Sequence, residues 1–166
     1  MPQANDNPEP TYLALDLGSN SFHLVLATFR EGKMVRLDQR KETVRLASGL
    51  DGDGRLSEEA QERALQALRG FSALVVDRPP SRVRAVGTNT LRVAKNATRF
   101  LRRAEAVLGH RIDIISGIEE ARLIYKGVTH SLPPTDGLRL VMDIGGGSTE
   151  LILGRAANPS ALESTH

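Results

Sequence analysis

The sequence has no cysteine and no tryptophan, and among its 166 residues only two are tyrosine and four are phenylalanine. Without cysteine the chain has no disulfide bonds, no thiolate metal ligands and no cysteine nucleophile. So few aromatic side chains cannot provide the stacking platforms on which the bases of single-stranded nucleic acids lie. We therefore expect neither a disulfide-stabilised scaffold nor a nucleic-acid-binding protein.

Long hydrophobic runs are absent as well. No apolar stretch approaches the roughly 20 residues that cross a bilayer. Residues 1–10 are polar, contain three prolines and lack the apolar centre of a signal peptide, so we interpret them as a disordered leader. Together with the missing cysteines, these features predict a soluble cytoplasmic protein without an integral membrane segment.

The charges nearly cancel, because 22 lysines and arginines face 20 aspartates and glutamates, for a net charge of +2. Lysine occurs only at positions 33, 41, 95 and 126, so most of the positive charge is arginine. The planar guanidinium group suits phosphate and carboxylate ligands, although genomic base composition can produce the same bias. The basic run at 92–103 is typical of a solvated helix face, and the low net charge argues against nucleic acid as its partner.

Hydrophobic periodicity predicts strands that alternate with helices, an order typical of an α/β sheet. The first helix begins after Ser57, a favourable N-cap residue, and is ended by Pro79-Pro80. Two further helical segments lie between Thr90 and Gly109 and from Ser116 to His130. The expected strands are 12–17, 22–29, 34–46, 83–86, 112–115, 138–144 and 150–153.

An internal repeat joins the two ends of the chain. The segment LALDLGSNS at 13–21 matches LVMDIGGGS at 140–148 in four of nine positions, at an offset of 127 residues. At the same offset the apolar triplet 24–26 falls on the triplet 151–153. Two hairpins that repeat a strand, an aspartate, a glycine turn and a second strand indicate duplicated domains.

Each hairpin turn has the composition of a phosphate-binding loop. Glycines allow a positive φ and a close approach of backbone N–H groups to an anion, and the serine, threonine and asparagine side chains add donors. The aspartate before each turn, Asp16 or Asp143, can hold Mg²⁺ through its waters. A single hairpin of this kind is usually an ordinary turn, but the matched pair favours a phosphate site. Its predicted phosphate-binding residues are Gly18, Ser19, Asn20, Ser21, Gly145, Gly146, Gly147, Ser148 and Thr149.

Four ordered motifs give the chain a family resemblance from about Tyr12 to Leu162. They are DLGSNS at 16–21, GTNTLRVAKN at 87–96, ISGIEEARLI at 115–124 and DIGGGSTE at 143–150. They resemble the exopolyphosphatase / guanosine pentaphosphate phosphohydrolase (Ppx/GppA) family of the actin-like ATPase superfamily. The resemblance implies a ribonuclease-H-like domain with a mixed sheet flanked by helices at 11–125, and the opening hairpin of a second, truncated domain at 126–166. The chain is therefore expected to be an N-terminal fragment.

The resemblance also implies roles for single residues. It places the base that activates water at Glu120 and suggests Arg92 as a phosphate clamp. The sequence separates Glu120 from Glu119, because Ser116-Gly-Ile-Glu119 fits a capping box in which Glu119 reaches back to the Ser116 N–H. Glu150 is a metal ligand, a residue that positions water, or an ordinary strand glutamate. His23 lies on an apolar strand and is predicted to be a core histidine.

The function implied is Mg²⁺-dependent hydrolysis of the terminal phosphate of inorganic polyphosphate, in a cleft between two domains. Phosphoryl transfer needs charge stabilisation and an aligned nucleophile, which two loops, a metal and a glutamate supply. Guanosine pentaphosphate is the alternative substrate, and an ATP-dependent kinase of the same fold is a more remote alternative. The resemblance implies a homodimer for the full-length form.

Overall fold

The computed structural model describes residues 9–76 and 79–166 of the chain. Residues 1–8, most of the expected disordered leader, lie outside the described residues. The elements in chain order are β1 (Thr11–Leu17), β2 (Ser21–Arg30), β3 (Lys33–Thr43), the short 3₁₀ helix η1 (Ala47–Gly49), α1 (Glu58–Leu74), β4 (Arg82–Gly87), α2 (Asn89–Val93), α3 (Ala97–Leu108), β5 (Ile112–Ile114), α4 (Gly117–Ser131), β6 (Leu138–Ile144), β7 (Thr149–Arg155) and β8 (Asn158–Thr165).

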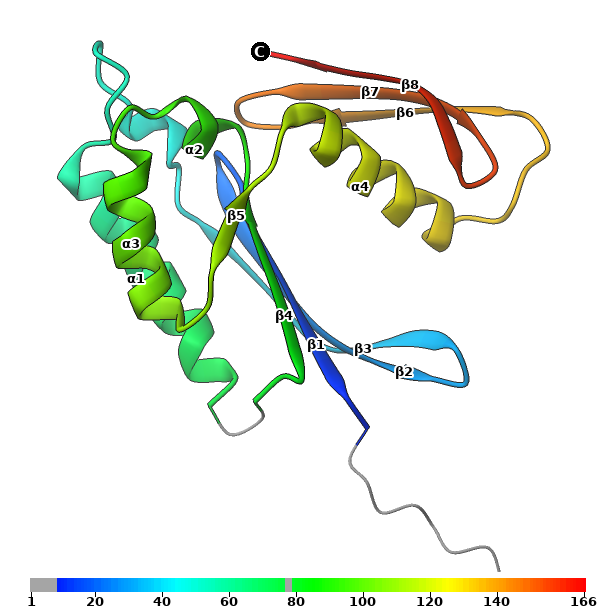
Figure 1. The fold of residues 1–166 in the computed structure, drawn as a ribbon, viewed down its shortest axis with the longest axis horizontal. Helices are drawn as coiled ribbons and strands as arrows, with labels where there is room; N and C mark the ends of the chain where they lie inside the picture. Colours follow the sequence, from blue (N-terminus) through cyan, green and yellow to red (C-terminus); the bar gives the residue numbers. More distant parts are fainter. Residues whose placement is uncertain (1–8, 77–78) are drawn as a thin grey trace, which may run out of the picture.

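The first five strands form one mixed sheet in the order β3-β2-β1-β4-β5 (Figure 1). The pairs β1–β2 and β2–β3 are antiparallel, whereas β4 is parallel to both β1 and β5. Alternate side chains of β1 and β2 point to one face, where they meet the apolar stripes of α1 and α3. This mixed sheet with its packed helices confirms the expected α/β class. The largest fully buried side chains of this core are Phe22, Phe71, Phe100, Leu13, Leu15, Leu17, Leu24, Leu46, Leu65 and Leu68.

Capping residues mark the start of α1 and the end of α3. The Ser57 side chain accepts a hydrogen bond from the Ala60 N–H at the start of α1, as predicted. Helix α1 ends at Leu74, five residues before Pro79, so the prolines are not what terminates it. Helix α3 ends at Gly109, whose φ of +76° places it in the left-handed conformation that glycine adopts without strain.

The last three strands form a separate antiparallel sheet in the order β6-β7-β8, with α4 packed on it (Figure 1). Its small core consists of Ala121, Tyr125, Val141 and Ile152. The sequence predicts only a hairpin here; the structure adds β8 as a third strand. The expected domain boundary after Tyr125 falls inside α4, whereas α4 as an element packs mainly on β7 and β8 of the second sheet.

The outer side of the second sheet, away from α4, is apolar and exposed. Every second residue of β6 from Leu138 to Ile144 is a large apolar side chain that is more than half exposed. Large apolar side chains of β6 therefore turn outward, whereas the residues between them, Arg139, Val141 and Asp143, point to the face that carries α4. No helix in the described parts of the chain is long and apolar enough to cross a membrane.

Tyr125 is the side chain on which the second unit depends. It is fully buried, and its hydroxyl donates a hydrogen bond of 3.1 Å to the Ala156 carbonyl. We expect Tyr125→Phe to lower the free energy of unfolding by about 0.5–1.5 kcal/mol, the net contribution of one hydrogen bond. Tyr125→Ala should cost about 3–5 kcal/mol because it leaves a cavity. Urea denaturation of both variants measures this, and equal losses would show that the ring contributes no packing.

Candidate active site

The two glycine turns lie against each other in the space between the two sheets. A Cβ atom on Gly146 would lie 2.8 Å from the Cβ of Asn20, and one on Gly147 would lie 2.6 Å from Ser19 Oγ. Such contacts are shorter than any that real Cβ atoms make, so only glycine allows the second loop this close to the first. The repeat therefore brings residues 127 positions apart in sequence into one site.

The two turns have the same internal geometry. A Cβ atom on Gly18 would lie 2.8 Å from the Ser21 carbonyl oxygen, and one on Gly145 would lie 3.0 Å from the Ser148 carbonyl oxygen. The predicted positive φ is wrong for these loops: glycine is required by lack of space and not by the left-handed conformation. The glycines with a positive φ in the described part of the chain are Gly32, Gly54 and Gly109.

The first turn of α2 holds both loops. The Thr90 hydroxyl lies 2.7 Å from Ser19 Oγ, and the Thr90 N–H donates to the same oxygen. The neighbouring Asn89 side chain donates to the Gly147 carbonyl. Sequence reasoning placed a turn here but missed this role, because the partners lie 58 and 71 residues away.

The backbone of the first loop is anchored from its other side. The Asn20 carbonyl accepts hydrogen bonds from the N–H groups of Val44 and Arg45, and the Ser19 carbonyl accepts one from Ala47. Since these carbonyls are bound behind the loop, its polar side chains are held toward the second loop and the space between them. The loop is thus built before any ligand arrives.

A polar cavity of about 330 Å³ lies at the meeting point of the loops. It brings together most of the predicted phosphate-binding residues with Glu120, Asp16, Asp143 and Glu150. Two predicted residues, Arg92 and Thr149, do not line it. The full lining is Asp16, Gly18, Ser19, Asn20, Ser21, His23, Lys41, Thr88, Glu120, Asp143, Ile144, Gly145, Gly146, Gly147, Ser148 and Glu150.

Four carboxyl groups share this cavity. Burial, together with the charges of Glu120 and Asp143, raises the pKa of Asp16 to about 6. Burial also raises the pKa of Asp143, with a further contribution from the charge of Glu150. Glu150 is almost fully buried and accepts a hydrogen bond of 2.8 Å from the Ser164 hydroxyl. Because these carboxyl groups lie close together, the charge of each one disfavours ionisation of the others unless a cation lies among them.

The carboxylates are chemically suited to the expected Mg²⁺ ion, but they do not form a complete set of direct ligands. Asp16 Oδ1 is buried and accepts no hydrogen bond from the protein, so it has a free acceptor site. In the described parts of the chain no three acidic or histidine side chains converge as direct metal ligands. Mg²⁺ keeps several waters and uses one or two carboxylates. Asp16 and Asp143, in the equivalent positions of the two hairpins, are therefore the residues that would hold it.

Glu120 and Glu119 differ as the helix start predicts, with one correction. Ser116 Oγ accepts a hydrogen bond of 3.1 Å from the Glu119 N–H, which confirms the N-cap. The reciprocal half of the capping box does not form, because the Glu119 carboxylate pairs with Arg122 on the exposed side. Glu120 turns into the cavity instead, and burial raises its pKa, an effect that Arg92 opposes.

Arg92 lies behind Glu120 instead of on the cavity wall. Its guanidinium donates hydrogen bonds of 2.8 Å to the Glu120 carboxylate and 2.9 Å to the Ile115 carbonyl. Both side chains of the pair are only 16% exposed. A largely buried arginine–carboxylate pair fixes the direction of the carboxylate. In this arrangement Arg92 positions Glu120; its role as a phosphate clamp stays a prediction.

The cavity residues that sequence reasoning missed are His23, Lys41, Thr88 and Ile144. The prediction of a core histidine is wrong, since His23 lines the cavity. The burial of its ring and the charge of Lys41 lower its pKa. The signal that could have found it is the repeat itself, because His23 stands 127 residues before Glu150.

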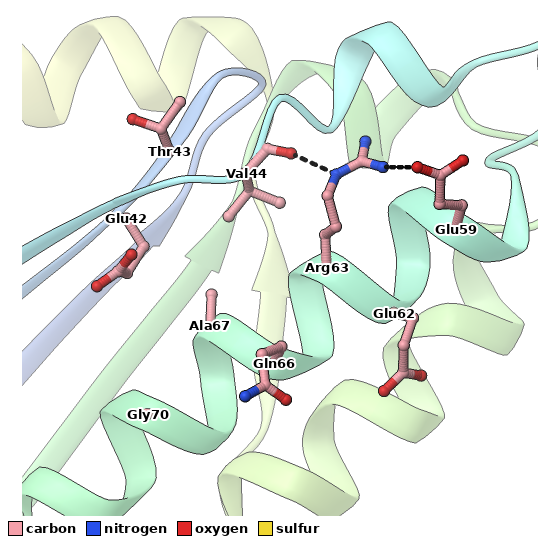
Figure 2. A pocket seen from close by; sticks show the side chains of 9 residues that line it. All are labelled: Glu42, Thr43, Val44, Glu59, Glu62, Arg63, Gln66, Ala67 and Gly70. Carbon is pink, nitrogen blue, oxygen red and sulfur yellow. Dashed lines mark hydrogen bonds and ion pairs between the residues drawn. The ribbon is translucent and has the colours of Figure 1, made fainter.

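A larger cavity of about 660 Å³ lies elsewhere, between α1 and the end of β3 (Figure 2). Glu42, Glu59 and Glu62 surround it, and its one arginine, Arg63, already donates to Glu59 and to the Val44 carbonyl. It has none of the loop donors of the smaller cavity. Its size does not make it a phosphate site, because its lining has three carboxylates and only one arginine, which is already paired.

Comparison with known proteins finds relatives of the same architecture. The family model described as "Ppx/GppA phosphatase family" matches residues 25–166. A PPX-GPPA enzyme of Aquifex aeolicus is 34% identical, with a TM-score of 0.84 over 95% of this chain and 52% of its own. An exopolyphosphatase of Cytophaga hutchinsonii is 32% identical, with a TM-score of 0.88 over 93% of this chain and 49% of its own. The chain thus spans about half the length of these solved relatives.

A more distant likeness concerns the fold alone. The ethanolamine utilization protein EutJ of Carboxydothermus hydrogenoformans is 20% identical, with a TM-score of 0.52 over 96% of this chain and 53% of its own. Its strands and helices follow the same general course. The expected mixed sheet flanked by helices, followed by part of a second unit, is confirmed.

The raised pKa of Asp16 makes stability depend on pH. A folded-state pKa of about 6 against an ordinary 3.8 means that the folded chain holds this proton more tightly than the unfolded chain. Stability therefore falls as pH rises through this range, by about 3 kcal/mol in all. Without divalent cations, Asp16→Asn should stabilise the chain by up to that amount near about pH 7.5 and by little near about pH 4. Equal effects at both pH values, in urea denaturation, would assign the change to packing.

The loop contact predicts a contrast between two glycines. An Ala side chain at position 147 would meet Asn89 Nδ2 and Ser19 Oγ, both 2.6 Å away, whereas one at exposed Gly52 would meet nothing within 4 Å. We expect Gly147→Ala to lower the free energy of unfolding by about 1–3 kcal/mol, as overpacking does. Gly52→Ala should be neutral or slightly stabilising. Urea denaturation compares them; a neutral Gly147→Ala would mean that the loops separate freely.

Proposed function

The chain belongs to the Ppx/GppA phosphatase family, and we propose that it supplies the phosphate-binding loops and the general base of an Mg²⁺-dependent exopolyphosphatase. In this proposal the terminal phosphate of inorganic polyphosphate is hydrolysed between the two units. The observation that carries it is the single cavity in which both glycine loops meet Glu120, Asp16, Asp143 and Glu150. Since the chain spans about half the length of its solved relatives, the activity of the whole protein is part of the proposal.

The cavity between the loops has the composition of a phosphate site. Its described lining residues include one aliphatic side chain, Ile144, and one aromatic ring, that of His23, whereas a neighbouring cavity that shares Asp16, Thr88, Glu120 and Asp143 is also lined by Val86, Ile115, Leu123 and Ile124. A guanine or adenine base needs an apolar or stacking surface, which both guanosine pentaphosphate and the ATP of a kinase would require. A linear phosphate chain needs donors and cations only. The cytoplasmic location and the homodimer of the full-length form remain expectations.

In this proposal Glu120 takes a proton from the attacking water. Burial raises its pKa, which brings its basicity closer to neutral pH, and Arg92 keeps it ionised and correctly directed. The loop residues Ser19, Ser21 and Ser148 line the same cavity, and their hydroxyl groups can bind phosphoryl oxygens. Mg²⁺ held by Asp16 and Asp143 would neutralise negative charge on the phosphate group and let these carboxylates stay ionised together.

Two adjacent glutamates give the sharpest test. Glu120→Gln keeps the size and the acceptor oxygen toward Arg92 but removes the base, so phosphate release from polyphosphate should fall by about 10²–10⁴-fold. Stabilisation of the protein by added tripolyphosphate should persist, because the variant loses a negative charge near an anion. Glu119→Gln, whose side chain faces Arg122 on the exposed side, is the matched control and should keep the rate.

Guanosine pentaphosphate and ATP serve as comparison substrates in the same phosphate-release assay. Faster release from guanosine pentaphosphate than from polyphosphate would transfer the proposal to the alternative substrate. An inactive Glu119→Gln beside an active Glu120→Gln would reverse the assignment of base and helix-start residue. Transfer of phosphate from ATP to an added alcohol, without phosphate release, would favour a kinase.

A further inference from the structure

The two hairpins place equivalent side chains in two rows across their sheets. In the first sheet the register pairs Asp16 with His23 and His23 with Lys41. Directly opposed residues of antiparallel strands point to the same face, so these three side chains form one row. In the second sheet the same positions, 127 residues later for the first two, carry Asp143, Glu150 and then Ser164 on the third strand.

The two rows differ in charge, because only the first contains basic side chains. The second row has two carboxyl groups, and its Ser164 hydroxyl donates a hydrogen bond to the Glu150 carboxylate within the row. The first row begins with Asp16, next to the other carboxyl groups, and continues away from them to His23 and Lys41. Equivalent positions of a duplicated hairpin would be expected to carry similar side chains, unless the two halves of the cavity bind different groups.

His23 and Lys41 are available to a ligand. Both line the cavity, and they are the only basic side chains among its described lining residues. Within the parts of the chain that the structure describes, neither forms an ion pair or a side-chain hydrogen bond. The charge of Lys41 acts on the His23 ring, which places the two side chains in one electrostatic environment. A lysine used only for solubility would not need to face a cavity beside an imidazole.

We propose that His23 and Lys41 form a second anion subsite, which binds the phosphate group next to the one held by the two glycine loops. The inference rests on the proposed function and extends it to substrate choice. Neighbouring strands lie about 4.8 Å apart, so the row leads stepwise from the carboxyl groups at Asp16 outward to Lys41. A ligand with linked phosphate groups can reach both the loops and this row, whereas orthophosphate can reach only one of them. The ligand class is therefore a linear chain of phosphates.

The test compares two ligands on the same protein. Calorimetric titration with tripolyphosphate and with orthophosphate, at one fixed Mg²⁺ concentration, gives the affinity of each. Lys41→Gln should weaken tripolyphosphate about tenfold, the loss expected for one charge-assisted hydrogen bond, and change orthophosphate by less than about twofold. His23→Gln, which retains a donor, should weaken tripolyphosphate less. Lys33→Gln, on the same strand but outside the cavity, is the matched control and should change neither.

The possible outcomes separate the proposed subsite from the proposed function. Wild-type binding of tripolyphosphate that Lys41→Gln leaves unchanged overturns the subsite and leaves the proposed function intact. Equal weakening of both ligands also overturns it, since it shows a general effect of charge and not a second contact. Binding of neither ligand by the wild-type protein overturns the proposed function itself.

Discussion

The contact between the two glycine loops is the constraint on which the rest of the site depends. Gly146 and Gly147 approach Asn20 and Ser19 so closely that one methyl group on either glycine would separate them. Because the loops touch, the strands that lead into them end at the same place, and Asp16 and Asp143 are brought into one cavity. The hydrogen bonds of Asn89 and Thr90, one to each loop, then hold a juxtaposition that backbone pairing does not provide, since the two sheets share no strand.

Bringing the loops together also brings negative charges together, and the electrostatics of the site follows from this. The pKa values of Asp16, Asp143 and Glu120 all rise, chiefly because burial removes water from them. Two features offset the charge. Arg92 pairs with Glu120 from behind, and the basic pair of His23 and Lys41 lies at the far end of the row. A site arranged in this way has one end suited to a cation and another suited to an anion, which is the distribution that a metal-bound phosphate chain requires.

Much of this fold could be predicted locally. The strand–aspartate–glycine–strand pattern predicted both hairpins, because a tight turn tolerates few residue types, and Ser57 and Ser116 predicted their helix starts, because their side chains cap nearby N–H groups. Strand β8 was missed because Asn158–Thr165 is mostly polar and small, with little alternation to mark it. The side to which α4 belongs was missed because an apolar helical stripe does not specify which of two sheets it covers.

For the site, the sequence by itself determined which loop residues are available to line the cavity and that Glu120, not Glu119, is free to face inward. Those choices are made within one turn of helix or one hairpin, so local spacing decides them. Only the tertiary structure decided that Arg92 lies behind Glu120, that His23 lines the cavity and is not part of the core, and that glycine is needed for the approach of a second loop. Each of these depends on contacts between residues that are far apart in the sequence. Neither hydrophobic periodicity nor local propensity predicts such contacts.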